Sequence, residues 1–201
     1  MKKIVALALS AVLAMALAVS AAAADLSHTV APGDTMWKLA VKYRVGTGEI
    51  IAANPQVANP NLIYPGQRLR IPQVADAVLS CEAEVVRLVN ALRAEKGLQP
   101  LTANWELSRV ARYKSEDMVR SGYFSHTSPT YGTPFQMMKS FGISYRTAGE
   151  NIAYGQRTPA AVMEAWMNSS GHRANILSAS YTQIGVGYCA SGHYWTQMFI
   201  G

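Results

Sequence analysis

The pattern of apolar and polar positions separates the chain into two parts. In the first part, four apolar side chains fall at i, i+3, i+4 and i+7, which predicts a short helix with one apolar face: Met36, Leu39, Ala40 and Tyr43. Gly46 ends this helix, and Thr47 can cap a second short helix that ends at Asn54. Strand-like runs over 28–30 and 69–71 flank the helices. We therefore expect the order strand, helix, helix, strand.

The second part, from Glu82 onward, has longer apolar stripes at helical spacing. These stripes and their capping residues predict four helices, which begin near Glu82, Asn104, Thr133 and Thr158. Two strand-like runs over 184–188 and 194–199, joined by a turn with Gly192, predict an antiparallel hairpin. Helices before and after strands fit a layered α+β domain, so we predict an α+β fold class for the chain.

The first residues have the pattern of an export signal. Met1-Lys2-Lys3 is basic, an unbroken apolar run follows, and the small residues Ala22-Ala23-Ala24 end it. This combination predicts a secretory signal peptide over 1–24. An uncleaved anchor is the alternative, because the run is nearly long enough to span a bilayer. No cysteine stands directly after the run, and no later stretch is apolar enough to cross a membrane. We therefore expect a secreted protein without a transmembrane segment after cleavage.

The charge of the chain is mildly positive and dispersed. The formal net charge is +6, and without Lys2 and Lys3 the remaining 16 basic and 12 acidic residues leave +4. The basic residues form no cluster of four or more and no nucleic-acid-binding motif, so we expect no nucleic-acid partner. A weakly cationic exported protein is suited to an anionic cell wall.

The chain has two cysteines, Cys81 and Cys189. A disulfide between them would persist outside the cytoplasm, whereas the alternative is two buried free thiols. Neither cysteine has metal-site spacing or a neighbouring histidine in the sequence, so we do not expect a cysteine nucleophile.

Residues 27–73 resemble a LysM domain. The matching motifs are His28-Thr29-Val30, Pro32-Gly33-Asp34-Thr35-Met36-Trp37, Ala53-Asn54-Pro55 and Ile63-Tyr64-Pro65-Gly66-Gln67. The resemblance implies a small βααβ domain that binds N-acetylglucosamine-containing glycans, chiefly peptidoglycan and chitin. It also implies a shallow groove between two loops, formed by Gly33, Asp34, Thr35 and Met36 on one side and by Leu62, Ile63 and Tyr64 on the other.

These groove residues also have a purely structural interpretation. Asp34 and Thr35 can cap the first helix, and Ile63 and Tyr64 can pack in the core. Trp37, the next residue in the helix, can equally belong to the core. Both roles can coexist, because exposed backbone groups bind an acetamide while apolar side chains cover a sugar face.

Residues 81–201 resemble the bacterial branch of the CAP superfamily, the cysteine-rich secretory proteins, and 74–80 would be a linker. The matching motifs are Phe124-Ser125-His126, Gly149-Glu150-Asn151-Ile152-Ala153, Trp166-Met167-Asn168-Ser169 and Gly171-His172-Arg173. The resemblance implies a three-layer α-β-α sandwich with a cleft that contains His126, Glu150 and His172. Animal members usually have a second glutamate where this chain has Ser169, so the full acidic-histidine tetrad is absent.

Three roles for the cleft residues remain open. His126, Glu150 and His172 could bind zinc or another divalent cation weakly, since a zinc site needs three protein ligands. They could be catalytic, although the chain has no GxSxG, SxxK or Cys–His signal for a nucleophile. Glu150 and His172 could instead hydrogen-bond backbone groups in the turns where we place them, supported by Asn151, Arg173 and Asn175. No cofactor is assigned.

Two functions follow from the resemblances. The first is a secreted, non-enzymatic wall protein that holds peptidoglycan through LysM and binds a protein, peptide or lipid in the CAP cleft. A role in the spore coat or cortex is a further expectation, since the resemblance extends to exported proteins of spore-forming bacteria. The alternative is a peptidoglycan-targeted hydrolase, metal-dependent or not, that uses the cleft. The missing second glutamate and the missing nucleophile favour the first function.

Overall fold

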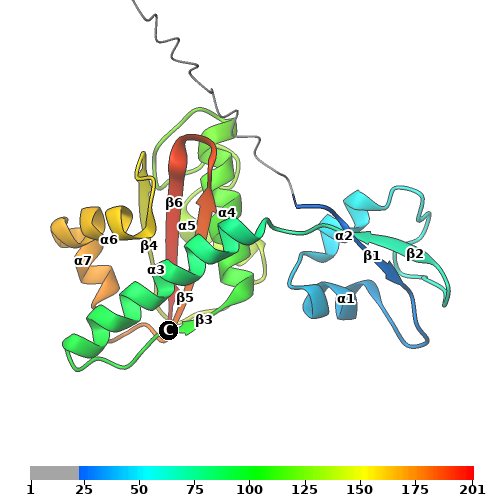
Figure 1. Cartoon of the computed structure of the whole chain (residues 1–201), viewed down its shortest axis with the longest axis horizontal. Coiled ribbons are helices and arrows are strands. Elements are labelled where there is room, and N and C mark those ends of the chain that lie inside the picture. Colours follow the sequence, from blue (N-terminus) through cyan, green and yellow to red (C-terminus); the bar gives the residue numbers. More distant parts are fainter. Residues whose placement is uncertain (1–22) are drawn as a thin grey trace, which may run out of the picture.

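The computed structural model describes residues 23–201 and arranges them in two units (Figure 1). The N-terminal unit extends from β1 (Leu26–Thr29) to β2 (Arg68–Ile71), and the C-terminal unit from α3 (Asp76–Glu95) to β6 (Tyr194–Ile200). The expected signal peptide lies outside the described residues, except for its last two residues. Within residues 23–201, no helix combines the length and the apolar character needed to span a bilayer.

The N-terminal unit has the predicted order of strand, helix, helix and strand. Helices α1 (Met36–Tyr43) and α2 (Thr47–Ala53) lie between β1 and β2, which pair antiparallel. Its core contains side chains from all three regular segments after β1, including Leu39, Ile50, Leu69 and Ile71. The start of α2 differs from the prediction, because the cap residue is Gly46 rather than Thr47.

The C-terminal unit is built on a four-stranded sheet with the order β3-β5-β6-β4. Strand β3 (Thr102–Ala103) is parallel to β5 (Gln183–Cys189), whereas β5, β6 and β4 (Ala148–Tyr154) are antiparallel neighbours. The predicted hairpin of two strands therefore exists as β5 and β6. Strand β4 adds an edge to it.

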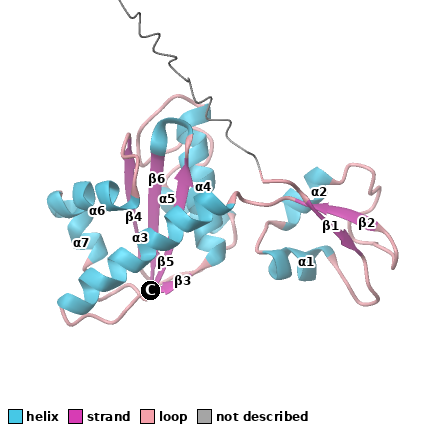
Figure 2. Ribbon diagram, viewed as in Figure 1, coloured by secondary structure: helices cyan, strands magenta, loops and turns pink. Residues whose placement is uncertain are grey.

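Helices cover both faces of this sheet (Figure 2). One face carries α4 (Trp105–Arg120) and α5 (Pro134–Ser140), whose apolar side chains pack with Met198 and Ile200 of β6. The other face carries α3, α6 (Pro159–Asn168) and α7 (Ser170–Ile176). The result is the three-layer α-β-α sandwich within an α+β fold.

Two glycines of β5 allow α4 to lie directly against the sheet. A Cβ at Gly185 would collide with the backbone of Leu107, and a Cβ at Gly187 would collide with the backbone of Ala111. Helix and strand backbones therefore approach more closely than larger residues would permit. This packing fixes the position of α4, whose C-terminal end leads into the loop with His126.

Three segments differ from the sequence-based expectations. Helix α3 begins at Asp76, so most of 74–80, which we expected to be a linker, is helical. Glu150 lies in β4 rather than in a turn, and His172 lies in α7 rather than in a turn. Strand β4 was not predicted, because its Glu150 and Asn151 are polar residues that the fold buries.

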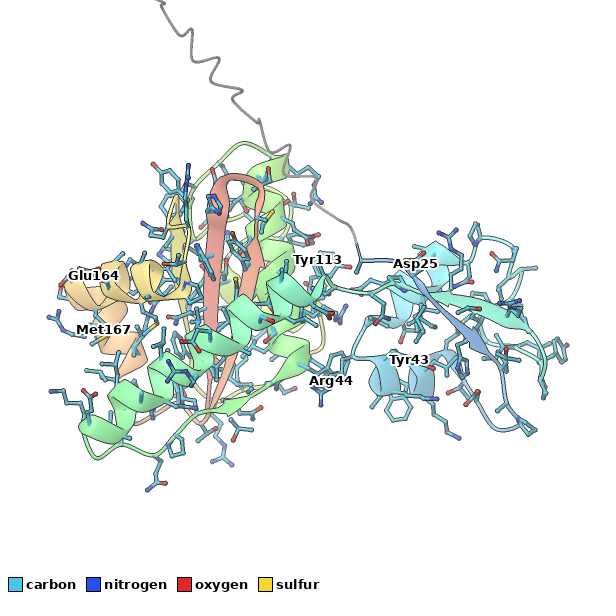
Figure 3. All side chains as sticks on the ribbon, in the orientation of Figure 1. Asp25, Tyr43, Arg44, Tyr113, Glu164 and Met167 are labelled. Carbon is cyan, nitrogen blue, oxygen red and sulfur yellow. The ribbon has the colours of Figure 1, made fainter. Side chains whose placement is uncertain are left out.

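The two units contact each other through Glu49 of α2. Its Oε1 accepts hydrogen bonds from Arg109 Nη1 (3.1 Å) and from the Tyr113 hydroxyl (2.7 Å), both on α4. Figure 3 shows Tyr113 on the side of the C-terminal unit that faces the N-terminal unit. Gly46 lies close to this contact, because a Cβ at this position would meet the ends of the Arg109 and Glu49 side chains.

Candidate functional site

The first candidate site lies at two adjoining loops of the N-terminal unit. Val30 joins the loops at their bases: its N–H donates to the Gln67 carbonyl (2.8 Å), and its carbonyl accepts from the Gly66 N–H (2.9 Å). The start of segment 31–35 and the end of segment 62–67 therefore lie side by side. Gly33 has a φ of +86°, in the left-handed region that favours glycine.

Asp34 holds the first loop in shape. Its carboxylate accepts a hydrogen bond from the Ala31 N–H (2.8 Å) and pairs with His28 Nε2 (2.9 Å). The other ring nitrogen of His28 bonds the Tyr43 hydroxyl (2.8 Å). The backbone hydrogen bond from Ala31, followed by the contact with His28, lowers the pKa of Asp34. Thr35 is the cap of α1, because its hydroxyl accepts from the Lys38 N–H (3.1 Å).

The apolar residues of this site fall into buried and exposed groups. Met36 is 5% exposed and packs in the core, so its side chain does not face a groove. Ile63 is partly buried against the same core. In contrast, Leu62 and Tyr64 are exposed by 51% and 59%, and Trp37 by 67%, so Trp37 is not a core residue. The exposed pair on the second loop therefore provides an apolar surface beside the loop that Asp34 stabilises.

The second candidate site surrounds Glu150 in the C-terminal unit. The Glu150 side chain is 1% exposed, and its Oε1 lies 2.8 Å from Nδ1 of His126, whose side chain is 53% exposed. Its Oε2 is buried and has no hydrogen-bond partner. Burial raises the pKa of Glu150, while the contact with His126 and the charge of Lys114 oppose this increase. A buried carboxylate thus orients an accessible imidazole.

A pocket of about 390 Å³ opens at this pair. His126 and Glu150 lie on one side of it, and Pro134 and Phe135 at the start of α5 provide apolar surface. Thr133, Asn175 and Tyr181 also line the pocket. The pocket therefore combines an acidic–imidazole pair with an apolar wall.

His172 does not line this pocket. Burial lowers the pKa of His172, and the charge of His126 lowers it further, so the two imidazoles are electrostatic neighbours. Among residues 23–201, no group of three His, Cys, Asp or Glu side chains is placed to hold a metal ion. His126 and Glu150 contact each other, but with His172 they form no three-ligand zinc site in this geometry.

Comparisons with known proteins agree with this architecture. Residues 86–199 match the model of the cysteine-rich secretory protein (CAP) family, and residues 28–72 match the LysM domain. This chain belongs to the CAP family. The LysM domain is its N-terminal unit, and the CAP domain is its C-terminal unit.

Three relatives illustrate the similarity. The uncharacterized protein YkwD of Bacillus subtilis is 61% identical over 125 residues, which cover 62% of this chain and 49% of YkwD. The SpoIVD-associated factor A of the same organism is 44% identical over 45 residues, 22% of this chain and 12% of that protein. The crystal structure of an extracellular SCP-domain protein from Bacillus anthracis has a TM-score of 0.59 at 31% identity, covering 68% of this chain and 47% of that one. This chain spans half or less of the length of these relatives.

Two buried charges of α4 position the His126 loop of the CAP domain. Lys114 is 1% exposed, and its ammonium donates to the backbone carbonyls of Ser125 (2.7 Å) and His126 (2.8 Å). Asp117 is fully buried and accepts from three hydroxyls of the same loop: Tyr123 (2.6 Å), Ser128 (2.6 Å) and Thr130 (2.8 Å). Neither Lys114 nor Asp117 was among the residues that the sequence predicted for the site. Lys114 was detectable, because it falls on the helical stripe that continues Leu107, Val110 and Ala111.

A second polar network fastens α7 of the CAP domain to β4. The Asn151 amide donates to the His172 carbonyl (3.1 Å), and the Asn175 amide donates to Asn151 Oδ1 (2.8 Å) and to the Glu150 carbonyl (3.2 Å). Arg173, which we expected in this network, donates to the Met167 carbonyl instead (2.6 Å). Asn151 and Asn175 are therefore the two residues that support the cleft from this side.

The two cysteines of the CAP domain are free thiols in this structure. Both are partly buried, and burial raises the pKa of each thiol. Of the two alternatives for Cys81 and Cys189, the structure thus contains the unbridged one. A raised pKa lowers the thiolate fraction, so neither residue has the features of a reactive nucleophile.

Proposed function

We propose that this protein is exported and anchored to peptidoglycan by its LysM domain, which binds the N-acetylglucosamine-containing glycan. The LysM and CAP domains, together with the extracellular relative, indicate a secreted or cell-surface protein. The observation that supports the binding role is the exposed pair Leu62 and Tyr64 beside the loop over 31–35. A flat apolar surface next to exposed backbone groups suits the acetamide and the face of a sugar.

The CAP domain then presents its cleft to a ligand at the wall. The exposed His126 imidazole and the buried Glu150 provide hydrogen-bonding groups, and Phe135 provides an apolar contact. A pocket with an apolar wall and a few polar groups is typical of a binding site for a peptide or a small molecule. We propose a non-enzymatic binding role, because no serine or cysteine lines the pocket as a nucleophile.

A second candidate function is peptidoglycan hydrolysis in the CAP cleft. The favouring observation is the contact between Glu150 Oε1 and His126 Nδ1, which leaves the other imidazole nitrogen available as a base for a water molecule. An orienting carboxylate behind an imidazole is also the arrangement in hydrolytic triads. Under this hypothesis, a His126→Ala protein would lose activity and keep its binding to the wall.

A sedimentation assay on purified peptidoglycan tests the anchoring role. We expect the protein over 25–201 to be retained and Tyr64→Ala to bind about tenfold more weakly, a loss of about 1.4 kcal/mol. Ile51→Ala is the matched control, because Ile51 is exposed on α2 of the same domain but lies outside the two loops. Equal retention of the Tyr64 and Ile51 variants would contradict the proposed groove.

The supernatant of the same sedimentation assay distinguishes binding from hydrolysis in the cleft. Soluble fragments are analysed after incubation with and without zinc. A binding role predicts that no muropeptides are released. Release that disappears in His126→Ala, while retention persists, would make the protein a hydrolase.

A spore-associated location is a separate part of the proposal. The match over 45 residues to the spore coat assembly protein ExsA of Bacillus cereus suggests the spore coat as the place where the glycan is bound. Fluorescence microscopy of a tagged protein during sporulation tests it. Signal on vegetative walls alone would restrict the proposal to the general cell wall.

A further inference from the structure

An exposed cluster of aromatic side chains lies on the CAP domain outside the pocket. We call it the aromatic platform: Phe124, Tyr154 and Tyr194. Phe124 is 45% exposed and Tyr154 is 54% exposed. The ring centroids of Phe124 and Tyr154 are 4.6 Å apart, and those of Tyr154 and Tyr194 are 5.6 Å apart with an interplanar angle of 25°. The three rings therefore form one continuous surface.

The platform is rigid because its residues belong to fixed elements. Tyr154 and Tyr194 are directly opposite each other in the β4–β6 ladder. Beyond them, the Gly155 N–H donates to the carbonyl groups of Gly192 and His193 and closes the end of the ladder. Phe124 lies in the loop that Lys114 and Asp117 hold from below. A ligand would thus meet aromatic rings that are already in place, which reduces the entropic cost of binding.

The platform lies near the pocket. Glu150 and Tyr154 are four residues apart on β4 and point to the same face, because side chains alternate along a strand. At about 3.3 Å per residue, the two positions are about 13 Å apart. Phe124 is two residues before His126 in the same loop. A linear ligand that spans this distance can therefore contact both the pocket and the platform.

The chemistry of the platform fits a sugar. The platform consists of three aromatic rings, and no hydrogen bond of the Tyr154 or Tyr194 hydroxyl occurs among the described residues. Each tyrosine thus offers an apolar ring face together with a free polar group. A pyranose has the complementary surface, with C–H groups on its faces and hydroxyl and acetamide groups on its rim. A lipid chain would leave the tyrosine hydroxyls unpaired.

We propose that the aromatic platform is a second glycan-binding subsite, which stacks a sugar of the same N-acetylglucosamine-containing polymer that the LysM domain binds. The inference rests on the proposed function in one respect, because the LysM domain brings the polymer to the CAP domain. Two weak sites on one long polymer bind more tightly than either alone, since the second contact becomes intramolecular. The platform contributes avidity on the intact wall and little on short oligomers that fill only the LysM groove.

The test compares single and double variants of the full mature chain on two probes, purified peptidoglycan and a short N-acetylglucosamine oligomer. We expect Tyr154→Ala to weaken retention on peptidoglycan about tenfold and to leave oligomer affinity unchanged. Tyr154→Phe should retain most of the binding, because the ring face remains. Ile51→Ala is again the control, since Ile51 is exposed on α2 of the other domain. Circular dichroism melting confirms that each variant is folded.

The outcomes separate the platform from the anchoring role. If Tyr64→Ala weakens both probes and Tyr154→Ala weakens neither, LysM anchoring stands and the platform proposal is overturned. If Tyr64→Ala has no effect on either probe, the anchoring role fails, and residual binding that Tyr154→Ala removes would still support the platform. Vesicles of phosphatidylglycerol form a third arm. Vesicle binding that Tyr154→Ala abolishes, without any effect on peptidoglycan, would make the platform a lipid-binding surface and contradict the proposal.

Discussion

The LysM groove and the CAP cleft place functional groups at the protein surface by different means. In the LysM domain, a loop of five residues is held by local contacts of Asp34, and the exposed Leu62 and Tyr64 need no buried support. In the CAP domain, His126 is exposed, but its loop depends on Lys114 and Asp117, which are fully buried. The groove is thus defined by nearby residues, whereas the cleft depends on charges in the protein interior.

This difference has energetic consequences. Local hydrogen bonds at a surface contribute about 1 kcal/mol each, so a change in the groove should affect binding more than stability. Buried charges are different, because removing one of their partners leaves polar groups without solvation. The CAP cleft should therefore be sensitive to substitutions that touch neither the pocket nor any ligand.

The largest expected effect comes from Lys114→Met. Methionine fills a similar volume but leaves the carbonyls of Ser125 and His126 without their buried donor. We expect the free energy of unfolding of the CAP domain to fall by about 2–4 kcal/mol, measured by urea denaturation, because two carbonyls lose their donor. Lys139→Met, on the exposed face of α5, is the control. Retention on peptidoglycan at low temperature should persist, and a variant as stable as wild type would show that the cleft does not depend on Lys114.

A smaller effect is expected from acid titration of Asp117. Burial alone would raise the pKa of this carboxyl, but hydrogen bonds from Ser128, Tyr123 and Thr130 outweigh it and lower the pKa from 3.8 to about 2. A lowered folded-state pKa stabilises the native state above pH 3.8, and this contribution disappears as the pH falls toward 2. The shift corresponds to about 2 kcal/mol.

The comparison of wild type with Asp117→Asn measures this contribution. The difference in the free energy of unfolding should be constant above about pH 5 and should shrink by about 2 kcal/mol between pH 4 and pH 2. Other carboxylates titrate in both proteins and cancel in the difference. A difference that does not change with pH would mean that Asp117 is not ionised in the folded state.

The same contrast explains which parts the sequence could predict. The LysM helices and strands were predictable, because Met36, Leu39 and Ala40 follow a helical period and glycine marks the turns. Of the residues expected in the groove, Leu62 and Tyr64 are exposed and Met36 is a core residue, and glycan binding by the exposed pair stays a prediction. Its apolar spacing already indicated the core, and only the family resemblance suggested a groove role.

The CAP cleft was less accessible to sequence reasoning. His126 and Glu150 were expected together and lie in contact, yet β4 was missed because its buried residues are polar. Pairing with β6 and the asparagine network satisfy the backbone of β4 and the Asn151 side chain, and both are contacts between distant residues. The two-residue strand β3 has no periodicity to detect. Lys114 is the buried residue of the site that the sequence indicated most clearly, because it falls on the apolar stripe of α4.

The smallest expected effect concerns the contact that joins the two domains. Glu49 is about three-quarters buried and accepts hydrogen bonds from Arg109 and Tyr113 of the CAP domain. Burial opposes ionisation of Glu49, but the hydrogen bonds of Gly46, Tyr113 and Arg109 outweigh it and lower its pKa. If this contact couples the domains, the LysM groove and the CAP cleft keep a fixed position relative to each other when the protein is bound to the wall.

A double-mutant cycle with Glu49→Ala and Tyr113→Phe measures this coupling. We expect an interaction energy of about 1 kcal/mol in the free energy of unfolding, because one partly buried charged hydrogen bond is lost. The exposed pair Glu84 and Arg87 on α3 is the control, and its cycle should show no measurable coupling. A cycle that closes to zero would mean that the Glu49–Tyr113 hydrogen bond does not couple the two domains, and this contact would then give no fixed relation between the groove and the cleft.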